Sequence, residues 1–255
     1  MTAVLATMRA AFAEALANRR SFWSQVMVMV MNDFAWVAFW VLFFHRVGEV
    51  RGWDGDRVLM LLSVLATTAG LVLGVLSNAR HIGPMAAEGE LDAALALPVP
   101  PLAYLLVRRV STVNLGDLLF GFGLFVAIGS PTLGRLVLYV LAVLAASMVL
   151  TGFLVAAGSL AFFTGRGETG DVGFNSILLL GNYPVDVFNG VAKLLLYTVV
   201  PAAFVGAMPA TLVDDFAPGR AFLLLAAAAV FAIGGWALFT LGLRRYSSGS
   251  VWTQA

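Results

Sequence analysis

The chain has 255 residues, of which 61% are hydrophobic and only 11% are charged, and its 15 basic and 14 acidic side chains leave a net charge of +1. A soluble domain keeps about a quarter of its residues charged, so this composition excludes a water-soluble globular protein. Because the sequence has no cysteine, it also excludes a disulfide scaffold and thiolate metal sites, and its near-zero net charge argues against nucleic-acid binding.

The first 21 residues predict a helix that lies on the inner surface of a membrane. Leu5, Met8, Phe12 and Leu16 are spaced by three or four positions and therefore share one helix face. The segment lacks the continuous apolar core and the cleavage site of a secretory signal. We therefore divide the chain into an interfacial helix, residues 1–21, and a single transmembrane domain, residues 22–255.

Six apolar stretches follow that are long enough to cross a hydrocarbon core of about 30 Å. They are residues 26–44, 58–76, 110–128, 136–163, 185–213 and 221–243. The fourth stretch is too long for one perpendicular crossing, so we expect it to tilt or to bend near Thr151 and Gly152. The predicted fold class is an all-α polytopic membrane protein with six transmembrane helices.

Basic residues beside these stretches predict the orientation, since Lys and Arg are retained on the cytoplasmic side. One set of flanks holds ten basic residues and the other holds five. The larger set is Arg9, Arg19, Arg20, Arg80, Arg108, Arg109, Arg166, Lys193, Arg244 and Arg245, and the smaller set is Arg46, Arg51, Arg57, Arg135 and Arg220. We expect a multi-pass protein of the cell inner (plasma) membrane with both termini in the cytoplasm.

Three ionisable residues fall inside the predicted spans, where such residues are rare and often functional. Lys193 lies near the start of the fifth stretch, and we expect its long side chain to extend to the inner interface. Asp33 and Asp117 lie about two turns from the inner side of the first and third stretches, at comparable depths. They could share a water-filled cavity there, either as a structural hydrogen-bonded pair or as part of a translocation path, and both interpretations stay open.

The remaining functional candidates are apolar. Phe120 and Phe204 could line the same path, which suggests a lipophilic or amphipathic substrate. No G-x-x-x-x-G-K-[ST] phosphate loop is present, since the only lysine, Lys193, stands in the sequence Val-Ala-Lys-Leu. His45 and His81 have no second ligand close by, so we expect no metal site and no catalytic residues. The chain is predicted not to be an enzyme.

Residues 80–98 are too polar to cross a membrane and too long for a turn. They carry an acidic cluster and an apolar helix face, made respectively by Glu88, Glu90 and Asp92 and by Leu91, Ala94 and Leu95. We expect a short amphipathic helix that begins near Glu90 and is stopped by Pro98, with its acidic first turn at the positive end of the helix dipole. The acidic cluster would fit a basic groove on a partner protein.

The sequence Glu88-Gly89-Glu90-Leu91-Asp92, followed by leucines and a proline, resembles the cytoplasmic coupling segment of the permeases of type-two ATP-binding-cassette transporters. That segment usually has the form Glu-x-Gly-Thr-Leu-Glu-x-Leu-Leu followed by Pro. Here Glu90 stands where threonine is common, and no residue separates the first acid from the glycine. Further short motifs are similar to the branch of small six-span permeases: Tyr183-Pro184, Pro201-Ala202-Ala203-Phe204, Met208-Pro209 and Arg245-Tyr246-Ser247-Ser248-Gly249-Ser250.

This resemblance implies the transmembrane permease subunit of an ATP-driven exporter. ATP and Mg would be bound by a separate ATP-binding subunit, so the permease itself would hold no cofactor. The residues that the resemblance makes the ATPase-coupling site are Glu88, Gly89, Glu90, Leu91, Asp92 and Leu95. It also implies a second permease, identical or sibling, and a re-entrant outer segment in the proline-rich part of the fifth stretch.

Two other classes of function stay open. A proton-coupled secondary transporter would use Asp33 and Asp117 as a proton relay and should contain an inverted internal repeat, which the two halves of the sequence do not display. A membrane scaffold or immunity protein would bind a partner without transporting anything. Transport by this chain in vesicles without ATP would favour the first, and a loss of partner binding without a loss of export would favour the second.

Overall fold

The computed structural model describes residues 2–128 and 132–246. Within these residues the chain is helical, and the only β-type pairing is an isolated bridge between Val50 and Trp53. The predicted all-α class is therefore confirmed. Of the C-terminal motif, residues 247–250 lie outside the described part of the chain.

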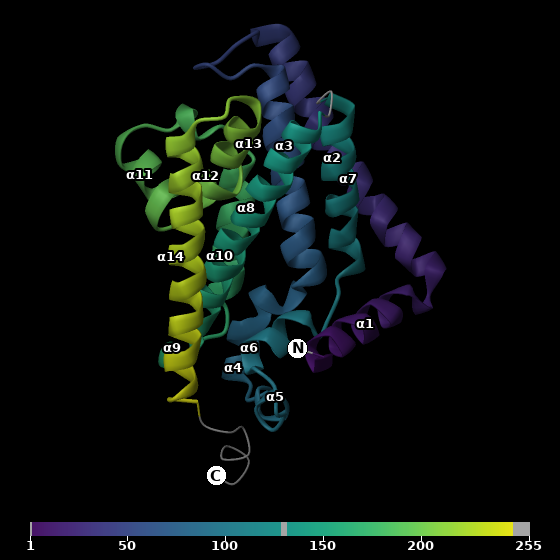
Figure 1. Ribbon diagram of the computed structural model, residues 1–255, viewed down its shortest axis with the longest axis vertical. Helices are drawn as coiled ribbons and strands as arrows, with labels where there is room; N and C mark the ends of the chain where they lie inside the picture. Colours follow the sequence, from purple (N-terminus) through teal and green to yellow (C-terminus); the bar gives the residue numbers. More distant parts are fainter. Residues whose placement is uncertain (1, 129–131, 247–255) are drawn as a thin grey trace.

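Five long helices run between a lower and an upper end of the molecule (Figure 1). They are α2 (Arg19–Val47), α3 (Gly55–Ala69), which continues as the π-helical segment η1 (Gly70–Val75), α7 (Thr112–Ile128), α8 (Leu133–Ser159) and α14 (Pro218–Leu243). By length and composition, four helices of the described chain are each able to cross a membrane, and the number rises to six if two bent helix pairs count as one span each. Each of these helices overlaps a predicted stretch.

The fifth predicted span, residues 185–213, is not one continuous helix. It forms η3 (Val185–Val187), α11 (Gly190–Thr198), α12 (Ala202–Val205) and α13 (Ala207–Asp214), with a bend of 61° after α11. Both ends of this hairpin lie at the upper end. Asp186 before it accepts a hydrogen bond from Trp53 of the α2–α3 loop, and Asp214 at its end pairs with Arg135 at the start of α8. The hairpin therefore enters from the upper end and returns to it.

The fifth passage through the bundle is made instead by α10 (Thr169–Gly181). It begins at the lower end, where Asp171 lies 3.8 Å from Arg80, and it ends beside Leu65 in the middle of α3. A helix of 13 residues is only about 20 Å long, and this one includes Asp171, Asn175 and Ser176, so its apolar signal is weak. α1 begins at the same end of the molecule where α14 finishes (Figure 1).

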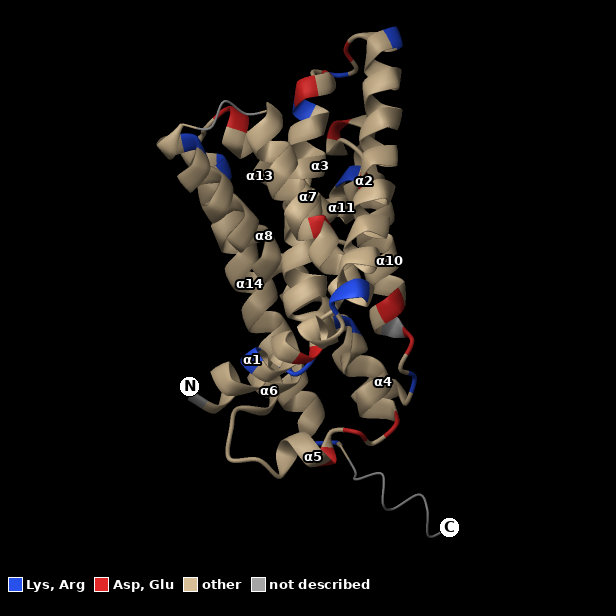
Figure 2. Cartoon of the chain, turned by 90° about the vertical axis from the view of Figure 1, so that its right-hand side faces the viewer, with Lys and Arg blue, Asp and Glu red and all other residues tan. Residues whose placement is uncertain are grey.

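The lower end is built from short helices. They are α1 (Thr2–Ala17), η2 (Ser77–His81), α4 (Ile82–Ala87), α5 (Asp92–Leu95), α6 (Pro101–Val107) and α9 (Ala161–Thr164). Lys, Arg, Asp and Glu gather mostly at the two ends of the molecule, and the length between them carries few (Figure 2). Large apolar side chains such as Leu42, Phe222 and Ile233 are exposed along that length, as a bilayer-facing surface requires.

The four residues of the predicted apolar face of α1 differ in their burial. Met8 and Phe12 are half-buried, because α1 packs against α6, whereas Leu5 and Leu16 are exposed. The helix ends at Ala17, four residues before the predicted boundary, and α2 begins at Arg19. Leu5 and Leu16 are available to contact a lipid surface, and the interfacial location of α1 stays a prediction.

The pair formed by α8 and α14 bears on the fourth predicted stretch, which was expected to tilt or to bend. α8 continues as one helix through Thr151 and Gly152, where a bend was an expected alternative to tilt. Gly152 has a different role, since a Cβ atom there would overlap the carbonyl oxygen of Phe231, and one at Gly235 would overlap the carbonyl oxygen of Gly152. The two helices therefore cross with their backbones in contact, which only residues without a side chain permit.

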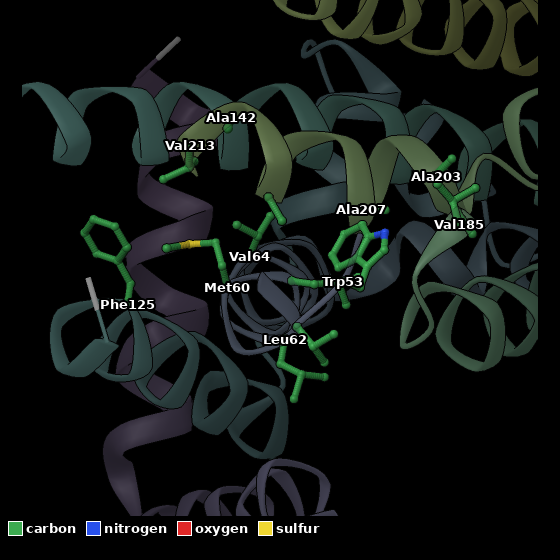
Figure 3. Close-up of a cluster of buried hydrophobic side chains, with 14 of the residues drawn as sticks. Trp53, Met60, Leu62, Val64, Phe125, Ala142, Val185, Ala203, Ala207 and Val213 are labelled. Carbon is green, nitrogen blue, oxygen red and sulfur yellow. The ribbon is translucent and has the colours of Figure 1, made fainter. Parts of the chain in front are cut away.

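The apolar core surrounds α3. At its upper part, Met60 and Val64 of α3 pack with Phe125 of α7, Ala142 of α8 and Ala207 of the hairpin (Figure 3). A second cluster continues toward the middle through α3, α8, α13 and α14. A third cluster lies at the lower end and joins α4, α5 and α6 to α8 and α14. This last contact connects the predicted coupling segment with the long helices.

Candidate functional site

The acidic segment, residues 88–97, follows α4 in a tight turn. Gly89 has a φ of 77°, a conformation that favours glycine, and the backbone N–H of Glu90 donates to the carbonyl oxygen of Met85 at 2.9 Å. This is the Schellman arrangement that ends a helix with glycine. The resemblance pointed to this glycine, and the structure supplies a backbone reason for it.

The helix predicted from Glu90 to Pro98 is shorter than expected. Only α5, Asp92–Leu95, is helical, because the turn around Gly89 extends to Leu91 and because residues before Pro98 disfavour the α conformation. Of the predicted apolar face, Leu91 and Ala94 are completely buried, whereas Leu95 is exposed. The segment is therefore a single anchored turn rather than an amphipathic helix.

The buried side of the segment is fixed to the bundle. Leu91 and Ala94 pack in one cluster with Leu105 of α6, Val155 of α8 and Phe239 of α14. Burial, together with the nearby charge of Asp92, raises the pKa of Tyr246, which follows α14. The exposed side carries the three acids Glu88, Glu90 and Asp92. A force applied to these acids would reach α8 and α14 directly.

A second candidate site lies between α2, α3 and α7. Asp33 and Asp117 line one cavity of about 120 Å³, and their carboxyl groups are close enough to interact electrostatically. The prediction that they share a cavity is therefore confirmed in geometry, and their role stays a prediction. Asn114 donates to Oδ2 of Asp117 at 3.2 Å.

The two carboxyl groups lack compensating charge. Asp117 is only 3% exposed, and its Oδ1 atom, like Oδ2 of Asp33, is buried and accepts no hydrogen bond from the described residues. None of the residues lining the cavity is basic. The salt bridges found in the described chain involve other acids, namely Asp171, Asp186, Asp214 and Asp215.

Other residues of the cavity were not predicted. They are Asn32 and Trp36 of α2, Asn114 of α7 and Asn182 after α10, with the apolar Met29, Leu62, Leu65, Ala66, Ala69, Leu73 and Leu178. Asn114 stands three positions before Asp117, and Trp36 three after Asp33, so helical spacing could have identified both. Asn182 had no such signal, because α10 itself was not recognised as a crossing.

The two phenylalanines that were expected to line one path lie in different parts of the structure. Phe120 lines the acidic cavity and packs edge-to-face on Phe34, with ring centroids 5.0 Å apart. Phe204 instead lies in α12, is buried in the second cluster and packs against Tyr197. It does not line this cavity, because α12 belongs to the hairpin on the other side of α3.

At the upper end, the α2–α3 loop holds the hairpin. Arg51 donates to the carbonyl oxygen of Asp186 and to the side chain of Asn189, each at 2.9 Å, and Lys193 pairs with Asp186 at 2.6 Å. Burial opposes ionisation of Asp186, but the hydrogen bonds from Lys193 and Trp53 and the charges of Lys193 and Arg51 outweigh it and lower its pKa.

These contacts correct the placement of Lys193. It was predicted at the inner end of the fifth span, together with the lower-end arginines, but it lies beside the α2–α3 loop at the upper end. Moving it changes the count of basic residues from ten against five to nine against six. The lower end still has more basic residues than the upper end, so the predicted orientation is unchanged, but the excess is smaller.

Comparison with known proteins gives one match. The family model described as "ABC-2 family transporter protein" matches residues 29–250, which include both candidate sites and exclude α1. No curated protein and no solved structure matches the chain.

Proposed function

The chain belongs to the ABC-2 transporter family and is a multi-pass membrane permease component, and from this premise we propose that it is the translocating subunit of an exporter powered by a separate ATPase chain. ATP and Mg²⁺ would bind to that partner. The acidic segment, residues 88–97, is the proposed docking site.

The observation that carries this proposal is the two-sided construction of the acidic segment. Its acids are exposed, while Leu91 and Ala94 are buried against residues of α6, α8 and α14. A free loop would absorb the movement of a partner, but an anchored turn transmits it. Nucleotide-driven closure of an ATPase on this segment would therefore move α8 and α14, which are joined along their length.

A second permease is part of the same proposal. One copy of the bundle leaves α2 largely uncovered, with only Val26, Trp40 and Phe44 buried. The acidic cavity lies beside this uncovered helix, so a second copy packed on α2 would enclose a path. The partner is either an identical chain or a sibling permease. The lower end, where α1 begins and α14 ends, would face the cytoplasm.

Charge reversal tests the docking site. We expect Glu88→Lys with Glu90→Lys to release the ATPase during purification of the complex, while the permease keeps its melting temperature. The matched control is Glu49→Lys with Asp56→Lys, which reverses two exposed acids at the upper end. Retention of the ATPase and of ATP-dependent transport in the Glu88 and Glu90 variant would refute the proposed docking site.

The carboxyl pair favours one alternative, a proton-coupled carrier that uses Asp33 and Asp117. The two hypotheses differ in their energy source. Vesicles that contain the permease without ATPase or ATP, and to which a pH gradient is applied, should show no substrate accumulation if the exporter proposal is right. Accumulation under those conditions would favour the carrier.

A further inference from the structure

The acidic cavity lies next to a second, apolar space. A groove of about 320 Å³ between α2 and α7 is lined by Val30, Phe34, Leu119, Phe120, Gly123, Leu124 and Ala127. Phe120 lines both spaces, and Phe34 packs against it. Phe34 and Leu119 are also exposed on the outer surface, 59% and 53% respectively, so the groove borders the region that lipid would occupy.

The two adjoining spaces have opposite chemistry. One contains two carboxyl groups, each with one oxygen that makes no hydrogen bond to the described residues, and three asparagine amides and Trp36 line the same cavity. Burying such groups is costly unless a cation or a hydrogen-bond donor accompanies them. The other space contains only apolar side chains and one glycine, and it offers nothing to a charged group.

From this arrangement we propose that the permease binds a cationic amphiphile, with its ammonium group in the acidic cavity and its hydrocarbon part in the α2–α7 groove. This names the substrate class of the transporter and rests on the proposed function. The N–H groups of an ammonium supply the donors that Oδ2 of Asp33 and Oδ1 of Asp117 lack. Trp36 and Phe120 add aromatic faces that attract cations.

Size limits what each space holds. The acidic cavity, at about 120 Å³, is the smaller of the two spaces and suits an ammonium group with few substituents. The groove is more than twice as large and is open toward the surface, which suits a chain of variable length. The cavity therefore restricts the size of the charged group, whereas the groove accepts hydrocarbon parts of different lengths.

Binding of three probes to the permease in lipid nanodiscs tests this inference. Dodecylammonium combines both parts, methylammonium carries only the charged group, and uncharged dodecanol carries only the chain. Uptake by empty nanodiscs is subtracted. We expect saturable binding of dodecylammonium, weaker binding of methylammonium, and no saturable binding of dodecanol. Saturable dodecanol binding of equal affinity, or no saturable binding of dodecylammonium, would overturn the inference.

Two variants separate the spaces. Asp117→Asn keeps the shape of the cavity and removes one charge, so the affinity for dodecylammonium should fall about tenfold or more. Gly123→Leu fills the groove without a clash, since a Cβ atom at Gly123 meets nothing within 4 Å. It should weaken dodecylammonium binding and leave methylammonium binding unchanged.

Gly234→Leu is the matched control, because Gly234 of α14 is equally unobstructed and lies outside both spaces. Wild-type affinity in both Asp117→Asn and Gly123→Leu would refute the assigned site even if the permease is folded and transports. The measurement needs no ATPase, so its failure would leave the docking proposal intact. Loss of docking in the Glu88 and Glu90 variant would likewise leave this binding unchanged.

Discussion

α8 and α14 meet backbone to backbone at Gly152 and Gly235, whereas α2, α3 and α7 meet around a cavity that contains two uncompensated carboxyl groups. Between α8 and α14 the contact depends on close packing, and a side-chain atom added at Gly152 or Gly235 would force the helices apart. Around the cavity, two carboxyl groups are buried without a basic partner, which costs stability. Residues that reduce stability without an evident structural gain are typical of functional sites. The comparison therefore fits the proposed binding site, with ligand recognition by α2, α3 and α7 and structural support from α8 and α14.

The largest effect is expected from Gly152→Ala. The added methyl group would overlap the carbonyl oxygen of Phe231, so we expect a loss of about 3 kcal/mol or more in the free energy of unfolding. Gly234→Ala places the same group in open space and should be neutral or stabilising by up to about 1 kcal/mol. Thermal unfolding of both variants in detergent measures the difference. Equal melting temperatures of the two variants would contradict the close backbone contact between α8 and α14 at Gly152.

Leu91→Ala should have the next largest effect. Leu91 is completely buried between the acidic segment and the long helices, so its truncation should cost about 2–4 kcal/mol locally and reduce stimulation of the partner ATPase. Leu95 is exposed on the same turn, and Leu95→Ala should change stability by less than about 0.5 kcal/mol. Hydrogen exchange of residues 88–97 distinguishes the two. Equal protection in both variants would mean that Leu91 does not anchor the segment.

Asp117→Leu tests the acidic cavity between α2, α3 and α7. Replacing a buried, uncompensated carboxyl group by an apolar one should leave stability unchanged or raise it by about 1 kcal/mol, even though Asn114 loses its acceptor. Binding of dodecylammonium should be lost. A structural hydrogen-bonded pair predicts the opposite, namely a loss of about 1–3 kcal/mol in the leucine variant and wild-type transport in Asp117→Asn.

The smallest effect concerns the upper-end contact of Asp186. Its pKa is lower in the folded protein than in the unfolded chain, so its contribution to stability is present above the ordinary carboxyl pKa of about 4 and is lost as the pH falls through the lower folded value. Because Asp186 and Lys193 are 41% and 40% exposed, solvent screens the pair, and we expect no more than about 0.5–1 kcal/mol. Asp186→Asn should flatten this part of the stability profile between pH 5 and about pH 3. An unchanged profile would contradict the contact.

The sequence predicts the long crossings well because each is a continuous apolar stretch bounded by charge. It misses α10, which has only 13 residues and is interrupted by Asp171 and Asn175, so it does not form a continuous apolar stretch of spanning length. The hairpin that follows is the longer apolar stretch, so a search for stretches of membrane-spanning length selects it instead. Lys193 was misplaced for the same reason.

The two candidate sites differ in how far sequence alone predicts them. Asp33 and Asp117 stand out because acids are rare in apolar helices. Both lie about two turns from the inner side of their stretches, so packing of α2 against α7 brings the two side chains together. The groove beside them has no sequence signal, because Phe34, Leu119 and Gly123 resemble any residues facing lipid. In the acidic segment, the spacing of Leu91, Ala94 and Leu95 predicts one face, but only Leu91 and Ala94 are buried and Leu95 is exposed.

Since α1 begins and α14 ends at the same end of the molecule, two copies can be joined in tandem by a flexible peptide that never enters the bilayer. A Gly/Ser linker of n residues spans about 5–6 Å × √n, so a few tens of residues would reach from one copy to the next. Such a fused dimer allows Asp117 to be substituted in one half only. Its transport rate would then report whether one charged cavity is sufficient for a complete transport cycle.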